Sequence, residues 1–128
     1  MVEFDPTLPL ERAKTIPSTW YYDPAIAERE RERIFANAWQ CVGRVDQVAE
    51  NGRYFTAEIA GEKILVIRGD DGMVRAFFNV CRHRAAPILT DDTGCVGKLR
   101  CQYHGWTYDL AGRLKGTPEF EGVCDFRK

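Results

Sequence analysis

The sequence predicts a mainly β fold, an antiparallel β-sandwich or barrel preceded by one N-terminal α-helix. After residue 39, short runs rich in β-branched and aromatic residues alternate with turn-forming sequences such as Asn51-Gly52 and Asp70-Asp71-Gly72. Before residue 39, one stretch has helical periodicity instead. The 128 residues, of which 45% are apolar, suffice for one domain with a buried core. We therefore expect an arm and helix over residues 1–39 and a β-domain over residues 40–128.

The expected helix begins at Asp23-Pro24, where aspartate is a typical N-cap and proline fits the first turn. Between residues 25 and 39 the apolar side chains fall on or near one face, and the alternating charges of residues 28–33 supply the solvated face. Three prolines interrupt residues 1–22, which predicts an irregular arm. Its aromatic residues at 20–22 are expected to pack against a neighbouring element.

Six β-prone runs follow the helix. They cover residues 40–45, 53–59, 63–68, 73–79, 94–101 and 106–114. The first four follow one another closely and are separated by turn residues, so they predict an antiparallel meander. The last run is expected to fold back on itself at Ala111-Gly112.

Composition excludes several classes of function. The net charge is −1, with 18 basic and 19 acidic residues scattered along the chain, so no basic stripe indicates a nucleic-acid partner. The N-terminus has no basic and apolar leader, and the longest aliphatic run is residues 64–67, which predicts a cytoplasmic chain without a membrane anchor. In that setting the five cysteines are better interpreted as thiols or metal ligands than as disulfides.

Two short clusters each combine a cysteine with a histidine. They are Cys81-Arg82-His83 and Cys101-Gln102-Tyr103-His104. Both fall where an expected strand gives way to a loop, so two neighbouring loops could present four ligands to one site. A diiron cluster needs two ligands for each iron, and these loops together supply two thiolates and two imidazoles.

The charge balance explains why such a ligand set favours electron uptake. Two thiolates and two neutral imidazoles leave an oxidised [2Fe–2S] core uncharged, and the reduction potential rises from about −400 mV for all-cysteine clusters to roughly −150 to +300 mV. Reduction adds negative charge beside the imidazoles, so we expect electron uptake to depend on pH. The residues alone leave two alternatives. The first is a structural zinc site, because zinc accepts the same ligand types, although zinc fingers usually pair cysteine with cysteine. The second is that the four residues are unrelated loop residues, which requires that both histidines follow cysteines by chance.

The paired motif resembles the Rieske motif of ring-hydroxylating, Rieske non-haem iron oxygenases. The matching residues run from Cys81 to Arg84 and from Cys101 to Trp106, and the likeness extends over nearly all the chain from Trp20 onward. The resemblance implies a Rieske-type β-sandwich or barrel with two cluster-binding loops. It also implies a [2Fe–2S] cluster with the ligands Cys81, His83, Cys101 and His104, the cysteines on one iron and the histidines on the other.

Two departures from related patterns bear on the site. Respiratory Rieske proteins have an extra disulfide-bonded cysteine in each loop and a serine after the second His-Gly pair, and Ala86, Tyr103 and Trp106 stand there in this chain. Fewer hydrogen-bond donors imply a potential at the low end of the Rieske range, which suits electrons from a ferredoxin or flavin reductase. Ala85 stands where the oxygenases usually have glycine, which questions the backbone conformation of the loop but not the ligands.

Other residues near or outside the motif have ordinary explanations as well as functional ones. The three remaining thiols have no partnering histidine and are expected to be packing residues; they are Cys41, Cys95 and Cys124. Three arginines flank the ligands and either dock an acidic partner or are simply solvated; they are Arg82, Arg84 and Arg100. Trp106 and Tyr108 alternate on an expected strand and either shield the cluster or pack in the core.

The resemblance leaves two hypotheses for function. Family oxygenases oxidise their substrate at a mononuclear iron held by two histidines and a carboxylate in a separate domain, whereas the cluster claims both histidines of this chain. We therefore expect a truncated electron-entry domain that is not catalytic alone, or else a stand-alone soluble Rieske ferredoxin. Residues 1–39 resemble the oxygenase N-terminus and favour the first. The substrate stays open among aromatic acids, quaternary amines such as choline or betaine, and other small molecules.

Overall fold

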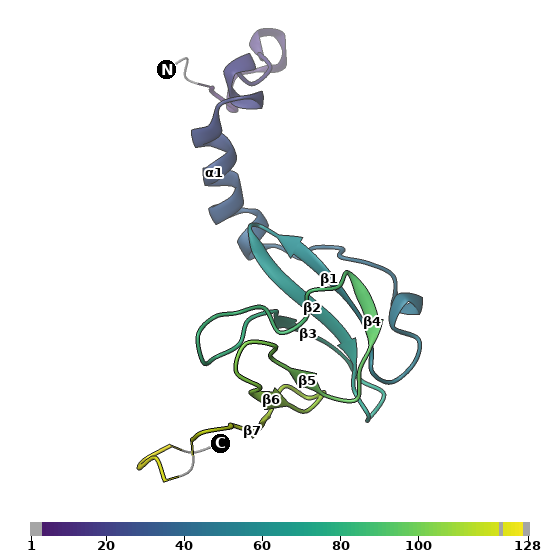
Figure 1. The fold of residues 1–128 in the computed structure, drawn as a ribbon. Helices are drawn as coiled ribbons and strands as arrows, with labels where there is room; N and C mark the ends of the chain where they lie inside the picture. The colour runs from purple at the N-terminus through teal and green to yellow at the C-terminus, as the bar shows by residue number, and fades with distance from the viewer. Residues whose placement is uncertain (1–3, 121, 127–128) are drawn as a thin grey trace. The chain divides into compact units, whose positions relative to one another are not determined.

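The N-terminal part of the chain contains the expected helix, which is shorter than predicted. A computed structural model describes residues 4–120 and 122–126 and divides the chain into two units, Met1–Gln40 and Cys41–Lys128 (Figure 1). Helix α1 spans Pro24–Arg33, and the Asp23 carboxylate caps it by accepting a hydrogen bond from the Ala25 N–H at 2.9 Å.

The prediction that the helix continues to residue 39 is wrong. After Arg33 the chain passes through Ile34 into a 3₁₀ turn over Phe35–Asn37. The side chain of Asn37 donates to the Glu32 carbonyl at 2.7 Å, and asparagine side chains that bond to the backbone in this way compete with helix continuation.

From residue 4 onward, the arm contains two 3₁₀ turns, over Leu10–Arg12 and Ser18–Tyr21. Trp20 is half-buried, and its ring meets that of Phe4 edge-on at 5.9 Å, as expected for a packed aromatic residue. Tyr21 and Tyr22 are exposed, so the expectation that all three aromatic residues pack is wrong for these two.

A four-stranded antiparallel sheet forms the larger layer of the second unit. Its strands are β1 (Arg53–Ile59), β2 (Glu62–Arg68), β3 (Val74–Phe78) and β4 (Thr93–Cys95), in the order β3-β2-β1-β4 (Figure 1). The register pairs Tyr54 with Ile67 and Ile64 with Phe78, which confirms the predicted meander for its last three strands.

The expected strand over residues 40–45 does not form, and a 3₁₀ turn over Val45–Val48 follows instead. Side-chain packing accounts for the difference. A Cβ at Gly43 would lie 2.7 Å from the Phe55 ring, and the Arg44 N–H donates to the Gln47 side chain at 2.7 Å. The segment thus packs through local side-chain contacts and not through a strand ladder.

A smaller antiparallel sheet has the order β5-β6-β7, with β5 over Leu99–Arg100, β6 over Thr107–Tyr108 and β7 over Leu114–Gly116. The run 94–101, predicted as one strand, therefore divides between two sheets, because β4 pairs with β1 while β5 pairs with β6. The run 106–114 folds back as predicted, but only its ends are strands.

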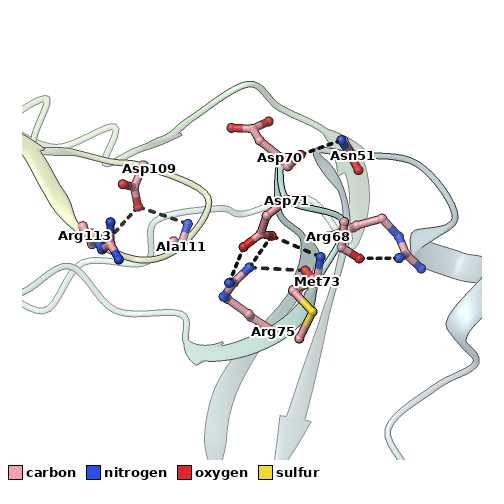
Figure 2. Close-up of polar contacts among 10 residues, drawn as sticks. Asn51, Arg68, Asp70, Asp71, Met73, Arg75, Asp109, Ala111 and Arg113 are labelled. Carbon is pink, nitrogen blue, oxygen red and sulfur yellow. Dashed lines mark hydrogen bonds and ion pairs between the residues drawn. The ribbon is translucent and has the colours of Figure 1, made fainter.

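Polar contacts close the turns at β2–β3 and β6–β7 (Figure 2). The Asp71 carboxylate accepts from Arg75 at 2.6 and 2.8 Å, and these bonds hold the pKa of Asp71 well below its ordinary value. The Asp109 carboxylate accepts from the backbone N–H groups of Ala111 and Arg113. Gly112 at φ +83° leaves no room for a side chain, because a Cβ there would lie 2.7 Å from the Phe77 ring. The second turn therefore packs on β3.

The core lies between the two sheets. One cluster of buried residues combines Leu65 and Ile67 of β2 with Leu99 of β5 and Tyr108 of β6. Val66 points to the other face of β2, where it packs in a second, smaller cluster, as strand alternation requires. These layers confirm the predicted antiparallel sandwich.

Candidate metal centre

Two loops with the same backbone hydrogen-bond pattern present the Cys-His clusters. In the first, the Cys81 N–H donates to the carbonyl five residues later at 2.8 Å, and the Ala85 N–H donates back to the Cys81 carbonyl at 2.9 Å. In the second, the Cys101 N–H donates to the carbonyl five residues later at 2.9 Å, and the Gly105 N–H donates back at 3.0 Å. The first loop follows β3 and the second follows β5, which confirms the predicted placement at strand ends.

Equivalent positions of the two loops have left-handed backbone. Ala85 has φ +57° and Gly105 has φ +73°. Glycine adopts this conformation freely, whereas a Cβ costs roughly 1–2 kcal/mol. Ala85 therefore adopts the same left-handed conformation as Gly105 of the second loop, and its backbone is strained there.

Both motif thiols are buried, and a tyrosine hydroxyl lies beside the first of them. Cys81 is 1% exposed and Cys101 is 2% exposed, and both belong to the main core cluster. The Tyr108 hydroxyl lies 3.4 Å from the Cys81 sulfur and accepts a hydrogen bond from the Arg82 N–H at 3.1 Å. Burial, then the hydrogen bond with Cys81 and the charges of both thiols, raises the pKa of Tyr108 to about 12. The hydroxyl therefore stays protonated and can donate to a thiolate.

The two imidazoles form a second pair. The ring centroids of His83 and His104 are 4.7 Å apart, at an interplanar angle of 70°. Desolvation, followed by the charges of His104 and Arg84, lowers the pKa of His83 and favours the neutral imidazole that binds metals. Nδ1 of His83 is buried and has no hydrogen-bond partner among the described residues. His104 is exposed.

These residues fit a Rieske cluster. The donors are two thiols and two imidazoles. The buried Nδ1 of His83 has no hydrogen bond among the described residues, and such a nitrogen is costly unless another group binds it. Among residues 4–120 and 122–126, no group of three or more His, Cys, Asp or Glu side chains gathers to hold a single metal ion. A [2Fe–2S] cluster asks for two protein ligands on each iron, which is the arrangement that the two pairs offer.

The three cysteines outside the motif are all exposed, so the interpretation as buried packing residues is wrong. Cys95 lies on the outward side of the short strand β4, where its sulfur meets the Asn51 carbonyl at 3.7 Å. Cys41 and Cys124 lie in irregular surface segments. The three flanking arginines are also exposed, as both interpretations of them require; these are Arg82, Arg84 and Arg100.

Sequence reasoning missed one residue that holds the first loop. Asn79 is 5% exposed, and its side chain accepts from the N–H groups of Ile88 at 3.1 Å and Leu89 at 3.0 Å. It also donates to the Leu89 carbonyl at 2.7 Å. Asn79 thereby joins the two ends of the loop. A polar residue at the end of an apolar strand, just before a ligand cluster, was the available signal.

Sequence reasoning also missed two aromatic residues of the C-terminal segment. Phe120 and Phe126 pack against Trp106, which is itself 5% exposed and stacks on His83. The two phenylalanines are half-buried. Nothing in their spacing distinguishes them from other tail residues.

The profile of the Rieske [2Fe-2S] domain matches residues 38–127, and the chain belongs to that family. It is 42% identical over 126 residues to the chloroplastic choline monooxygenase of Arabidopsis thaliana, which covers 98% of this chain and 30% of the relative. It is 38% identical over 116 residues to the carnitine monooxygenase oxygenase subunit of Escherichia coli K12, and this match covers 91% of this chain and 31% of the relative. The chain thus spans about a third of the length of these curated relatives.

Solved structures agree in fold. The quaternary ammonium Rieske monooxygenase CntA in complex with L-carnitine matches with a TM-score of 0.84 and 38% identity, over 91% of this chain and 33% of that one. Naphthalene 1,2-dioxygenase from Rhodococcus sp. matches with a TM-score of 0.80 and 34% identity, over 84% and 24%. In the part of the chain that the structure describes, no helix is long and apolar enough to cross a bilayer.

Proposed function

We propose that this chain takes up and passes on single electrons through a Rieske [2Fe–2S] cluster, as the electron-entry domain of an oxygenase α-subunit. The observation that supports the proposal most is the pair of matching loops, which bury two thiols and carry two imidazoles whose ring centroids lie 4.7 Å apart. Cys81 and Cys101 would hold one iron, and His83 and His104 the other. The cluster supplies one-electron chemistry when it is bound.

The surrounding residues suit that task. The core excludes water from both thiolates, which lie in a sandwich layer and not on the surface. The protonated Tyr108 hydroxyl, which accepts a hydrogen bond from the Arg82 N–H, directs its own O–H dipole at the Cys81 side of the site. The neutral state of His83 leaves its nitrogen lone pair available to a metal.

The oxygenase role is preferred to a stand-alone ferredoxin because the likeness includes the arm and helix. The match to the Arabidopsis relative covers 98% of the chain, residues 1–39 almost entirely included. Within this proposal a ferredoxin or flavin reductase donates electrons, the exposed arginines beside the loops meet it, and a mononuclear iron in a catalytic domain accepts them. The chain would not be catalytic alone.

Relatives also narrow the substrate of the parent enzyme. They include proteins named for choline, glycine betaine and carnitine, all of them quaternary ammonium compounds. We therefore favour a quaternary ammonium substrate over an aromatic one. A cytoplasmic location stays a prediction, because the plant relatives are named chloroplastic.

Metal content and ligand substitution test the proposal. Purified protein should contain about two irons and two acid-labile sulfides per chain and give the low-average-g EPR signal of mixed His/Cys ligation after reduction. Alanine at any of the four ligand positions should abolish that signal. Cys95→Ser, the matched control at an exposed thiol, should leave it intact. Stoichiometric zinc without iron after anaerobic reconstitution, or an unchanged signal in His104→Ala, would contradict the ligand assignment.

A second observation decides between the two roles. The reading frame beyond Lys128 should continue and encode a set of two histidines and one carboxylate suited to a mononuclear iron. A stop codon in the native gene at that point would favour the ferredoxin.

A further inference from the structure

The imidazole of His83 lies inside a group of aromatic rings that the ligand assignment does not use. The Trp106 ring stacks on it with an interplanar angle of 6° and a centroid distance of 4.8 Å. Phe120 meets both rings edge-on, at 5.8 Å from His83 and 5.2 Å from Trp106. Phe126 completes the group at 5.7 Å from Trp106 and 5.1 Å from Phe120.

We propose that Trp106 is a positioning residue for His83, and that Phe120 and Phe126 form an aromatic cap that braces Trp106 and keeps water from this imidazole. The inference rests on the proposed role of His83 as an iron ligand. It adds a function for the C-terminal segment, which would help to retain the cluster.

The reason lies in how ligating histidines are usually held. A metal-bound imidazole commonly donates its other N–H to a carboxylate or carbonyl, which fixes the orientation of the ring. No hydrogen bond from either ring nitrogen of His83 fixes the ring among the described residues, and the buried Nδ1 is the nitrogen left for the metal. A parallel indole in contact with the ring restricts its rotation instead. Edge-on rings on a stacked pair are a favourable aromatic arrangement, so Phe120 stabilises the stack and fills the space beside it.

The other imidazole has no comparable enclosure. His104 is exposed, and its ring neighbour Tyr103, at a centroid distance of 3.8 Å, is itself largely exposed. The cap therefore acts on one ligand only. Its loss should loosen the His83 side of the site and leave the rest of the sandwich in place.

The test compares variants of the cluster-loaded chain at one fixed pH. Trp106→Leu should alter the g-anisotropy of the reduced EPR signal and speed iron loss to a chelator about tenfold, the lower end of the effect of outer-shell partners on metal sites. Trp106→Phe, which keeps a ring against His83, should restore most of the difference. Replacing Phe120 and Phe126 together by alanine should also speed iron loss. Phe35→Ala, at a half-exposed phenylalanine in the other unit, should match the unaltered chain.

Each outcome decides the proposal. If Trp106→Leu fails to fold, the double phenylalanine variant decides alone, because its residues lie in the C-terminal segment. Unaltered iron loss and an unaltered EPR signal in that variant would overturn the cap. A merely structural role would lower the melting temperature without changing the signal or the chelation rate. His83→Ala separates the two ideas: if it keeps the Rieske signal, the ligand assignment fails, whereas if it loses the signal while the cap variants behave normally, only the cap fails.

Discussion

Replacing Asn79 by alanine should release the first cluster loop. Its side chain connects the end of β3 to residues 88 and 89 through three hydrogen bonds, of 3.1, 3.0 and 2.7 Å. Alanine removes all three at once and leaves the backbone groups of the far loop end without partners. The part of the loop that carries the ligands begins two residues after Asn79, and its two ends are then no longer joined through this side chain.

The magnitude follows from which groups remain unpaired. Ile88 is buried, so its N–H cannot turn to water, and a buried unsatisfied donor costs about 1–3 kcal/mol. The N–H and carbonyl of Leu89 are half-buried and should cost roughly 1 kcal/mol each, the ordinary net value of a hydrogen bond. The free energy of unfolding should therefore fall by about 3–5 kcal/mol. That is a large part of the 5–15 kcal/mol typical of a domain.

The assay is anaerobic thermal unfolding of cluster-loaded protein, followed by far-UV and visible circular dichroism. We expect the midpoint to fall by roughly 10 °C or more, with less cluster bound per chain. Asn51→Ala is the matched control, because Asn51 is exposed and its side chain donates a hydrogen bond to the Asp70 carbonyl at 3.1 Å (Figure 2). Its effect should stay below about 1 kcal/mol. Equal unfolding midpoints for the two variants would show that the Asn79 side chain does not hold the first loop closed.

Two further substitutions test the loops. Ala85→Gly should raise the free energy of unfolding by about 1 kcal/mol, since it removes a Cβ from left-handed backbone. The control Ala76→Gly, in the extended strand β3, should lower the free energy of unfolding by about as much. A denaturant titration in which both variants are less stable than the unaltered chain would contradict backbone strain at Ala85. Tyr108→Phe should lower the reduction potential of the cluster in a spectroelectrochemical titration, because a hydrogen bond to the Cys81 sulfur disappears. If the fully loaded variant keeps the potential of the unaltered chain, the hydroxyl does not act on the cluster.

The sequence predicted best where local pattern and turn chemistry agree. The β-prone composition and the Asn51-Gly52 turn located β1 with its observed bounds, and β2 and β3 were located within a residue or two at each end. The Cys-His clusters lie beyond β3 and β5, as their positions after β-prone runs implied.

Long-range contacts decided the rest. The strands β5 and β6 have two residues each, so they exist only because their partners lie beside them, and no local propensity marks such ends. Cysteine identity did not predict burial, since Cys81 and Cys101 are buried while Cys95 lies on the outward side of an edge strand. The hydrogen bonds of Asn79 join residues nine and ten positions apart, so they become visible only once the loop is closed.

The composition of the site implies that folding and cluster binding stabilise each other. Two thiols lie in an apolar core, where a thiolate without a partner is costly, and the buried nitrogen of His83 has no hydrogen bond among the described residues. Tyr108 supplies one hydroxyl to the first thiol, which compensates only part of that cost. On the proposed ligand assignment, metal ligation would remove the rest, because it would satisfy both sulfurs and the nitrogen together. The proposal therefore explains why an apolar sandwich retains two buried thiols and an unpartnered imidazole nitrogen, and it gives the loops, Asn79 and the aromatic cap one shared task, which is to hold these groups where a metal would bind.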